Sequence, residues 1–135
     1  MRQGRRATGR AGQKIASLAI GIRLIGVKKM YVVILVTVGN KKETKSIAEA
    51  LIKNKLAACV NIIDNIKSLF WWQGKVDNAK ELLLVIKSKK SKLTAVVKLI
   101  KSLHSYSVPE IIALPIVGGE KKYLEWIDDS LGKSR

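Results

Sequence analysis

The 135-residue sequence is poor in the residues that build common metal and redox sites, because it holds one cysteine and one histidine. A single cysteine excludes a disulfide within the chain and favours a reducing compartment, the cytoplasm. Neither a Cys-x-x-Cys motif nor a His-x-x-x-His pair is present, and no phosphate-binding glycine loop occurs. One chain therefore has too few soft donors for a closed metal site, and enzyme chemistry has little support.

Acidic residues are also scarce, with 10 Asp and Glu against 26 Lys and Arg, which gives a formal charge of +16. Residues 1–29 carry eight of the basic residues and no acid, whereas the remainder carries 18 basic and 10 acidic residues. Half of the net charge thus lies in less than a quarter of the length. We interpret residues 1–29 as a basic N-terminal extension and residues 30–135 as one domain.

Several interpretations of the extension remain open. Its apolar residues have the spacing of a short amphipathic helix: Ile15, Leu18, Ala19, Ile22 and Ile25. An arginine-rich segment without acids also resembles an organellar targeting peptide. Alternatively, the native chain starts at Met30 and residues 1–29 are a start-site artefact. The apolar run is too short, and too interrupted by Arg23, for a membrane span.

In the first half of the domain, the pattern predicts strand, helix and strand. Residues 31–38 are a β-branched run of strand length. Asn40 and Glu43 are spaced to cap a following helix, which Asn54 would end in a left-handed conformation. The apolar stripe of that helix is Thr44, Ile47, Ala48, Leu51 and Ile52. Residues 56–70 predict a long strand with a bulge near Asp64 and Asn65.

The second half predicts the return strand, a second helix, a last strand and a closing helix. Gln73 and Gly74 mark a turn before a strand at 81–88. Ser88 or Ser91 would cap the next helix, whose apolar positions are Leu93, Val96, Val97, Ile100 and Leu103. Pro115 places the strand at 111–117 on a sheet edge. In the closing helix, we expect one side to present Tyr123, Trp126 and Ile127.

This order predicts an α+β fold, the ferredoxin-like βαββαβ antiparallel sheet with helices on one face, plus a C-terminal helix. Such a sheet should alternate apolar and polar residues along each strand. Here every strand is apolar on both faces, so one face would exceed the apolar patch that a monomer tolerates. We therefore expect further copies of the chain to cover it, as a closed homo-oligomeric ring.

Several ordered blocks of sequence resemble the CutA divalent-cation tolerance family over about residues 31–131. Its alanine-cysteine strand start appears as Ala57-Ala58-Cys59-Val60-Asn61, and its tryptophan-x-glycine-lysine turn as Trp72-Gln73-Gly74-Lys75. Its hairpin glutamate and strand-end lysine are matched by Glu81 and Lys87. Its histidine-to-glutamate segment appears as His104-Ser105-Tyr106-Ser107-Val108-Pro109-Glu110, with serine in place of the usual proline after the histidine. Tyr123 and Trp126 match its closing aromatics.

The resemblance implies a homotrimer similar in shape to the PII signalling proteins, and a role in tolerance of copper and other divalent cations. Such proteins are binding or signalling modules rather than enzymes, and no organic cofactor is implied. The implied trimer agrees with the argument from two-faced strands.

Cys59 and His104 are the candidate metal ligands, since copper favours thiolate and imidazole donors. Residues from several subunits would have to meet to complete such a site. The alternatives are that Cys59 is a small core residue of an apolar strand and that His104 makes structural hydrogen bonds at a helix end.

A second candidate site is a cleft between subunits, suited to a small ligand. Its proposed lining residues are Trp72, Glu81, Lys87, Tyr106, Glu110 and Trp126. Lys87 would hold an anion, and Glu81 would orient a cation or pair with Lys87. The alternative is that these residues pack the hairpin and form salt bridges within the trimer.

The main functional hypothesis is a trimeric copper- or divalent-cation-responsive tolerance protein. The alternative is a PII-like scaffold that binds small anions or a partner protein, with no metal role. Nucleic acid is an unfavoured partner, because half of the charge lies in the extension and a lysine run is usually a solvated face.

Overall fold

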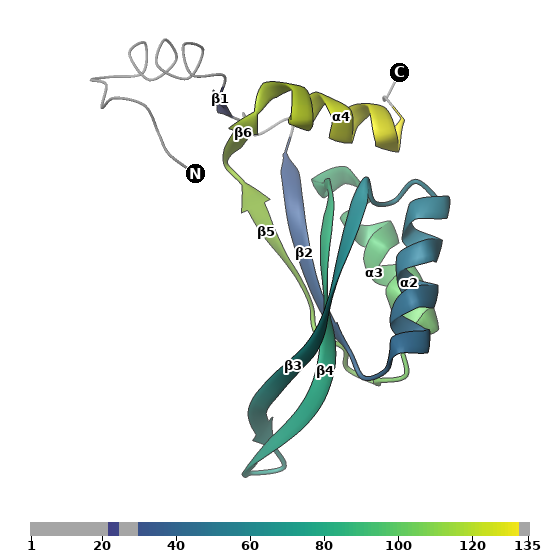
Figure 1. Cartoon of the computed structure of the whole chain (residues 1–135), viewed down its shortest axis with the longest axis vertical. Helices are drawn as coiled ribbons and strands as arrows, with labels where there is room; N and C mark the ends of the chain where they lie inside the picture. The colour runs from purple at the N-terminus through teal and green to yellow at the C-terminus, as the bar shows by residue number, and fades with distance from the viewer. Residues whose placement is uncertain (1–21, 25–29, 133–135) are drawn as a thin grey trace, which may run out of the picture.

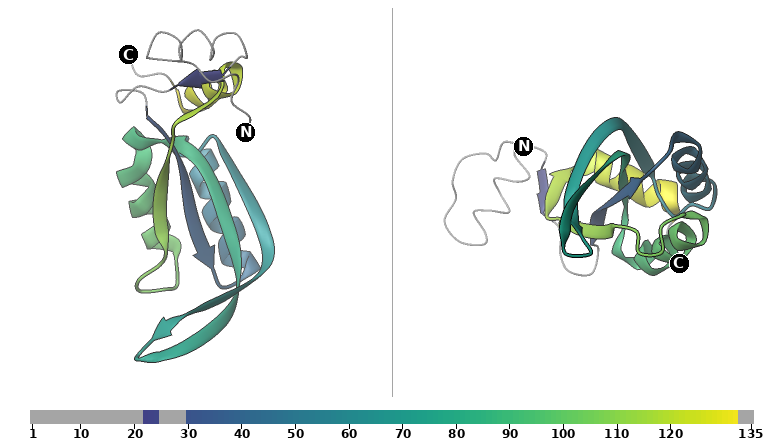
Figure 2. Two further views of the ribbon diagram at one scale, coloured as in Figure 1. Left: turned by 90° about the vertical axis from the view of Figure 1, so that its left-hand side faces the viewer. Right: turned by 90° about the horizontal axis from the view of Figure 1, so that it is seen from below.

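A computed structural model describes residues 22–24 and 30–132 of the chain, and four of its strands form one antiparallel sheet in the order β3-β4-β2-β5 (Figure 1). These strands are β2 (Tyr31–Val38), β3 (Cys59–Trp72), β4 (Lys75–Lys89) and β5 (Ile111–Ile116). The helices α2 (Lys41–Lys53) and α3 (Leu93–Leu103) cover one face of it (Figure 2). The predicted ferredoxin-like α+β fold is confirmed, and Pro115 lies in the edge strand β5 as predicted.

The core lies between the sheet and the two helices. Alternate residues of β2, from Val32 to Val38, face the helices and are at most 3% exposed. They pack with residues from β4 and from both helices: Leu84, Ile86, Ile47, Leu51, Val96 and Ile100. Burying each such side chain contributes on the order of 1.5–3 kcal/mol relative to leaving it exposed.

The ends of α2 confirm one prediction and correct two. Asn40 Oδ1 accepts the Glu43 backbone N–H at 2.8 Å, so the predicted cap is confirmed. Asn54 is not left-handed; its φ is −88°, and the next residue, Lys55, takes φ 55° instead. Ile52 is 45% exposed, because it lies beyond the side of the helix that meets the sheet.

The predicted serine cap of α3 is wrong. Ser88 is fully buried in β4, and its hydroxyl donates to the Leu56 carbonyl at 2.6 Å. Ser91 lies inside a 3-10 turn, η1 (Lys90–Lys92), so Lys92 occupies the cap position without a side-chain hydrogen bond. Leu103, expected on the apolar stripe, is 39% exposed at the end of the helix.

The hairpin of β3 and β4 extends well past the other strands (Figure 1). Its register shifts between Ile63 and Ile66, which confirms the predicted bulge, and Asn65 there has φ 57°. The two-residue turn has positive φ at both positions, 50° at Gln73 and 77° at Gly74, as a tight hairpin turn requires.

The C-terminal helix α4 (Lys121–Leu131) lies across one end of the sheet (Figure 1). Its buried side is Leu124, Ile127 and Leu131, which pack on Tyr31. Tyr123 and Trp126 are 42% and 44% exposed, so the expectation that they share a side with Ile127 is wrong. Asp128 of this helix accepts a hydrogen bond from the Tyr31 hydroxyl at 2.5 Å and forms an ion pair with Lys89 at 2.7 Å. Both contacts hold α4 against the sheet.

Two short strands were not predicted. β1 (Ile22–Leu24) pairs antiparallel with β6 (Gly118–Glu120), which directly precedes α4. The amphipathic helix predicted to run through Ile22 is therefore wrong at that residue. The rest of that predicted helix lies outside the described residues.

Candidate functional site

The face of the sheet opposite α2 and α3 carries apolar side chains that the described part of the chain leaves uncovered. Strand alternation places Val33 and Leu35 of β2 on this face, and the register adds neighbours from the other strands: Asn61, Ile63, Leu83, Val85, Lys87, Ile112 and Leu114. Ile63, Ile112 and Leu114 are 46%, 50% and 49% exposed. We call this surface the open face. The prediction that the strands are apolar on both faces is confirmed.

One end of the open face brings Cys59, Lys87 and Tyr123 together. Cys59 begins β3 directly opposite Lys87, whose ammonium lies 3.8 Å from the half-buried sulfur and also donates to Asn61 Oδ1. Burial, followed by the negative charge of the Cys59 thiolate, raises the pKa of Tyr123. The ring of Trp126 lies 5.4 Å from that of Tyr123. This end thus combines a thiol, a cation and two exposed aromatic rings.

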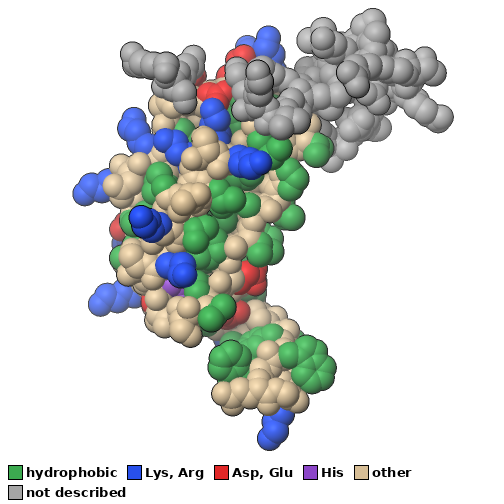
Figure 3. All heavy atoms as spheres, turned by 180° about the vertical axis from the view of Figure 1, so that it is seen from behind, with side chains coloured by type: hydrophobic (Ala, Val, Ile, Leu, Met, Phe, Trp, Pro, Cys, Tyr) green, Lys and Arg blue, Asp and Glu red, His purple; other side chains and the backbone are tan. Residues whose placement is uncertain are grey.

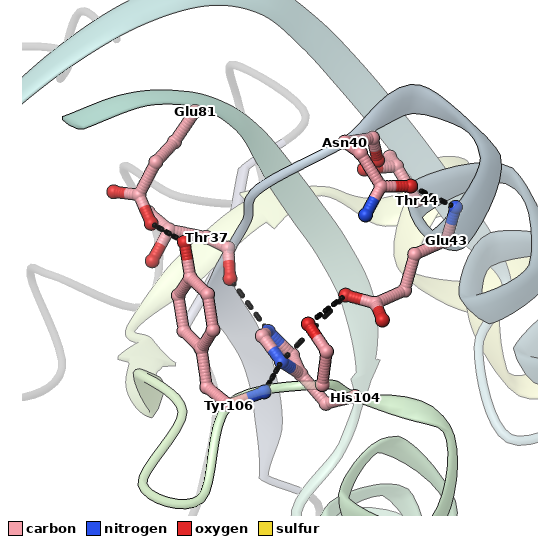
Figure 4. A network of polar contacts seen from close by, with 8 residues as sticks. Thr37, Asn40, Glu43, Thr44, Glu81, His104 and Tyr106 are labelled. Atoms are coloured by element: carbon pink, nitrogen blue, oxygen red, sulfur yellow. Dashed lines mark hydrogen bonds and ion pairs between the residues drawn. The ribbon is translucent and has the colours of Figure 1, made fainter.

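At the other end of the sheet, His104 forms a fixed network of hydrogen bonds (Figure 4). Its Nε2 lies 2.8 Å from the Thr37 carbonyl oxygen, which can only accept a hydrogen bond. Its Nδ1 accepts the Tyr106 backbone N–H at 3.1 Å. These partners suit the tautomer with its proton on Nε2, and both nitrogens are engaged. The Glu43 carboxylate lies 3.8 Å from Nδ1 and accepts the Ser105 hydroxyl at 3.1 Å.

Tyr106 joins this network to the sheet. Its hydroxyl donates to the Glu81 carboxylate at 2.8 Å, and Glu81 is only 7% exposed. Burial, the hydrogen bond to Glu81 and the nearby carboxylate charges raise the pKa of Tyr106 to about 12. A Cβ on Gly39 would lie 3.0 Å from the Tyr106 hydroxyl oxygen, so a side chain there would displace the ring.

Within one chain, Glu81 and Lys87 do not pair. The two residues are six apart on β4, which separates them by about 20 Å along the strand. The carboxylate is bound by Tyr106 instead, and the lysine by Asn61 and Cys59.

Cys59 and His104 are also far apart within one chain. Cys59 pairs with Lys87 of β4, and Lys87 pairs in turn with Val33 of β2. His104 instead contacts Thr37, which lies four residues further along β2. Val33 and Thr37 are about 13 Å apart along the strand. Among residues 22–24 and 30–132, no three Cys, His, Asp or Glu side chains gather in a way that would hold a metal ion. The thiol and the imidazole therefore cannot act together within one subunit.

The remaining cleft residues occupy other places. Trp72 ends β3 beside the hairpin turn and is 57% exposed, and Glu110 is exposed just before β5. Trp126 lies at the Cys59 end, and Tyr106 with Glu81 at the His104 end. One chain does not gather the six predicted cleft residues. Thr37, Gly39 and Glu43 belong to the His104 network, and sequence spacing gave no signal for the first two.

Comparison with known proteins connects this geometry to a family. Residues 32–130 match the model of the CutA1 divalent ion tolerance protein. The chain belongs to the CutA1 family. It is 50% identical over 103 residues to the rice protein CutA 1, chloroplastic. The aligned region covers 76% of this chain and 58% of the rice protein. It is 42% identical over 100 residues to the divalent-cation tolerance protein CutA of Thermus thermophilus, covering 74% and 97%.

Solved CutA structures agree with the fold. The crystal structure of CutA1 from Oryza sativa has a TM-score of 0.75 at 50% identity and covers 78% of this chain and 96% of that one. The structure titled periplasmic divalent cation tolerance protein CutA from Archaeoglobus fulgidus has a TM-score of 0.74 at 42% identity and covers 76% and 100%. The resemblance inferred from the motifs is confirmed.

The aligned region spans nearly the whole length of some CutA relatives but only part of others. The chain spans only 58% and 54% of the length of the rice and Arabidopsis thaliana proteins, both named as chloroplastic. Within the described part of the chain, no helix is long and apolar enough to cross a bilayer.

Proposed function

We propose that the protein is a homotrimeric divalent-cation tolerance protein that acts by binding metal ions or small ligands at boundaries between subunits. The observation that carries this proposal is the open face of a chain that belongs to the CutA1 family. Its relatives from Thermus thermophilus and Archaeoglobus fulgidus bear the divalent-cation tolerance name. No separate observation favours a scaffold without a metal role.

The trimer is supported by the extent of uncovered apolar surface. The register continues the open face into the hairpin through Phe70 and Trp72, which are 38% and 57% exposed. The other face of the hairpin carries Leu69, Trp71 and Val76, which are 67%, 76% and 61% exposed. Contiguous patches of this kind mark interaction surfaces rather than free solvent-facing ones. A cyclic trimer would bury the open face of every copy in the same way and leave no unmatched apolar surface.

A metal site at subunit boundaries follows from the shortage of donors within one chain. Cys59 lies at the rim of the open face, where a neighbouring subunit would bring further donors, and copper favours such a thiolate. His104 has both ring nitrogens engaged, so binding a metal would first break a hydrogen bond to Thr37 or Tyr106. We therefore propose Cys59 as the primary ligand and His104 as a secondary one.

Titration of the purified protein with Cu(I), Cu(II) and Zn(II) tests this assignment. We expect Cys59→Ala to weaken binding of the soft ion Cu(I) by at least about tenfold, because losing even a hydrogen-bonding partner of a metal ligand typically costs about 10–100-fold. His104→Ala should have the smaller effect. Unchanged affinity in both variants would remove both residues as ligands, and a thermal-shift hit with organic anions alone would favour the scaffold function.

We also propose that the domain is not an enzyme, that it works in the cytoplasm, and that residues 1–29 are an extension of it, of which Ile22–Leu24 pair with β6. The separation of the thiol from the imidazole supports the first point, and the single free cysteine supports the second. The family match starts at residue 32, which supports the third. N-terminal sequencing and fractionation of the natural protein test the last two points, and recovery from an organelle would refute the cytoplasmic location.

A further inference from the structure

The net positive charge of the described domain lies on its helix layer, by which we mean residues 41–55 and 90–103. This layer carries nine lysines against two carboxylates, Glu43 and Glu49. The other described residues of the domain, 30–40, 56–89 and 104–132, carry seven lysines and eight carboxylates. The charge is thus segregated by face, which a uniformly solvated lysine-rich surface would not show.

Little of the layer's charge is neutralised locally. Glu43 is directed inward toward His104 and Ser105, and among the lysines of the layer the described structure gives an ion pair only to Lys41, with Asp64 at 3.8 Å. In the space-filling view, lysine side chains project along the side occupied by the helices, beside a band of hydrophobic side chains (Figure 3).

The two helices bring their lysines together at one end. The contacts of Glu43 with His104 and Ser105 place the start of α2 beside the end of α3. Lys42 and Lys45 lie three residues apart on α2, as Lys98 and Lys101 do on α3, so each pair shares one side of its helix. All four are exposed. Their combined field attracts an extended polyanion more strongly than a single small anion.

The chemistry of the layer narrows the kind of polyanion. A helix that inserts into a membrane surface presents an apolar side to the lipid, but α2 and α3 use their apolar sides for the core. The layer contains no aromatic residue to stack unpaired bases, and no arginine to read base edges. What it offers is lysine point charges on a rigid surface, which suits the phosphates of a duplex.

We propose that the helix layer is a docking surface for the backbone of double-stranded nucleic acid, without sequence specificity. The sequence alone disfavoured this partner, because half of the charge lies in residues 1–29. The segregation of the remaining charge onto one face is what changes that assessment. The proposal does not depend on the metal function, and the proposed trimer would leave this layer facing outward.

Three variants of the full chain, each with three fewer positive charges, test the proposal. The helix-layer variant is Lys45→Gln, Lys98→Gln and Lys101→Gln. The hairpin variant is Lys67→Gln, Lys75→Gln and Lys80→Gln, all exposed on the β3-β4 hairpin. The extension variant is Arg2→Gln, Arg5→Gln and Arg6→Gln. Fluorescence anisotropy with a mixed-sequence duplex is measured between about 50 and 200 mM salt.

We expect the helix-layer variant to bind about tenfold or more weakly, and its slope of log K against log salt to fall by about 2 to 3. The hairpin variant should stay within about threefold of the wild type. Equal losses in all three variants, or the largest loss in the extension variant, would refute the proposal. Binding of the wild type to anionic vesicles but not to the duplex would also refute it. Light scattering confirms that each variant keeps the wild-type mass.

Discussion

The two faces of the sheet have similar apolar composition but opposite surroundings. On the face covered by α2 and α3, Ile34, Leu84 and Ile86 are fully buried. On the open face, Ile112 and Leu114 remain about half exposed. The covered face is therefore stabilised by the chain itself, whereas the open face can contribute its hydrophobic free energy only when another molecule covers it. The covered face therefore stabilises the fold of the subunit, and the open face is available to stabilise an assembly.

The largest expected effect comes from placing a charge on the open face. Ile112→Asp would put an unpaired carboxylate into the proposed interface, where desolvation of the charge opposes association. We expect the variant to be monomeric at micromolar concentration by light scattering. The matched control is Ile52→Asp, because Ile52 is 45% exposed on the helix side. A reduced mass in both variants, or in neither, would contradict the assignment of the proposed interface to the open face alone.

A cavity in the covered face tests the other half of the comparison. Leu84→Ala removes a fully buried side chain from the core and should lower the free energy of unfolding by about 2–5 kcal/mol. Urea denaturation at several protein concentrations measures the loss, and the concentration dependence separates assembly from folding. A loss below about 1 kcal/mol would show that the helices cover this face less tightly than their packing indicates.

The rim of the open face has a contact that depends on pH. Because burial raises the pKa of Tyr106 to about 12, above its ordinary value of 10.0, the neutral hydroxyl contributes stability that is complete below pH 10. This stability is lost as the pH rises toward 12. We expect Tyr106→Phe to cost about 1–3 kcal/mol at neutral pH, since Glu81 loses its hydrogen bond.

The same variant should lose less stability than the wild type between pH 10 and pH 12. Urea unfolding curves at pH 8 and at steps above pH 10 measure both effects. Tyr123→Phe is the comparison at neutral pH, where it should cost less than Tyr106→Phe because Tyr123 is not bonded to Glu81. Above pH 10 the raised pKa of Tyr123 makes a contribution of its own, which this variant removes separately. An identical pH dependence in wild type and Tyr106→Phe would contradict the role of this hydroxyl.

The smallest expected effect concerns the one hydroxyl buried in β4 on the covered face. Ser88→Ala removes the hydrogen bond to the Leu56 carbonyl and should cost about 1 kcal/mol. Thermal unfolding followed by circular dichroism is sufficient to detect it. The exposed Ser91→Ala is the control, since the sequence offered both serines as helix caps and neither is one. A larger loss for Ser91 than for Ser88 would contradict the observed placement.

Much of the fold could be predicted because its determinants are local. The β-branched run at Tyr31, the Asn40 cap and the Gln73-Gly74 turn each report their own conformation through nearby residues. The two-faced strands also predicted an uncovered apolar face, because alternation requires no knowledge of partners.

The site could not be predicted to the same extent because its contacts join distant segments. Tyr106 meets Glu81 across 25 residues of sequence, and His104 meets Thr37 across 67. No periodicity reports such pairs, so the contacts of Tyr106 and His104 were not predicted. Lys55 took the left-handed position expected of Asn54 because the α2 end is set by its hydrogen bonds to the last turn, not by residue preference alone.

The mass of the full-length protein in solution tests the central claim most directly. Sedimentation equilibrium at micromolar concentrations should give three times the chain mass of 14.9 kDa, because the proposed trimer would cover the open face. A protein that stays at the single-chain mass, folded and soluble across that range, would contradict the claim that the open face is an assembly surface.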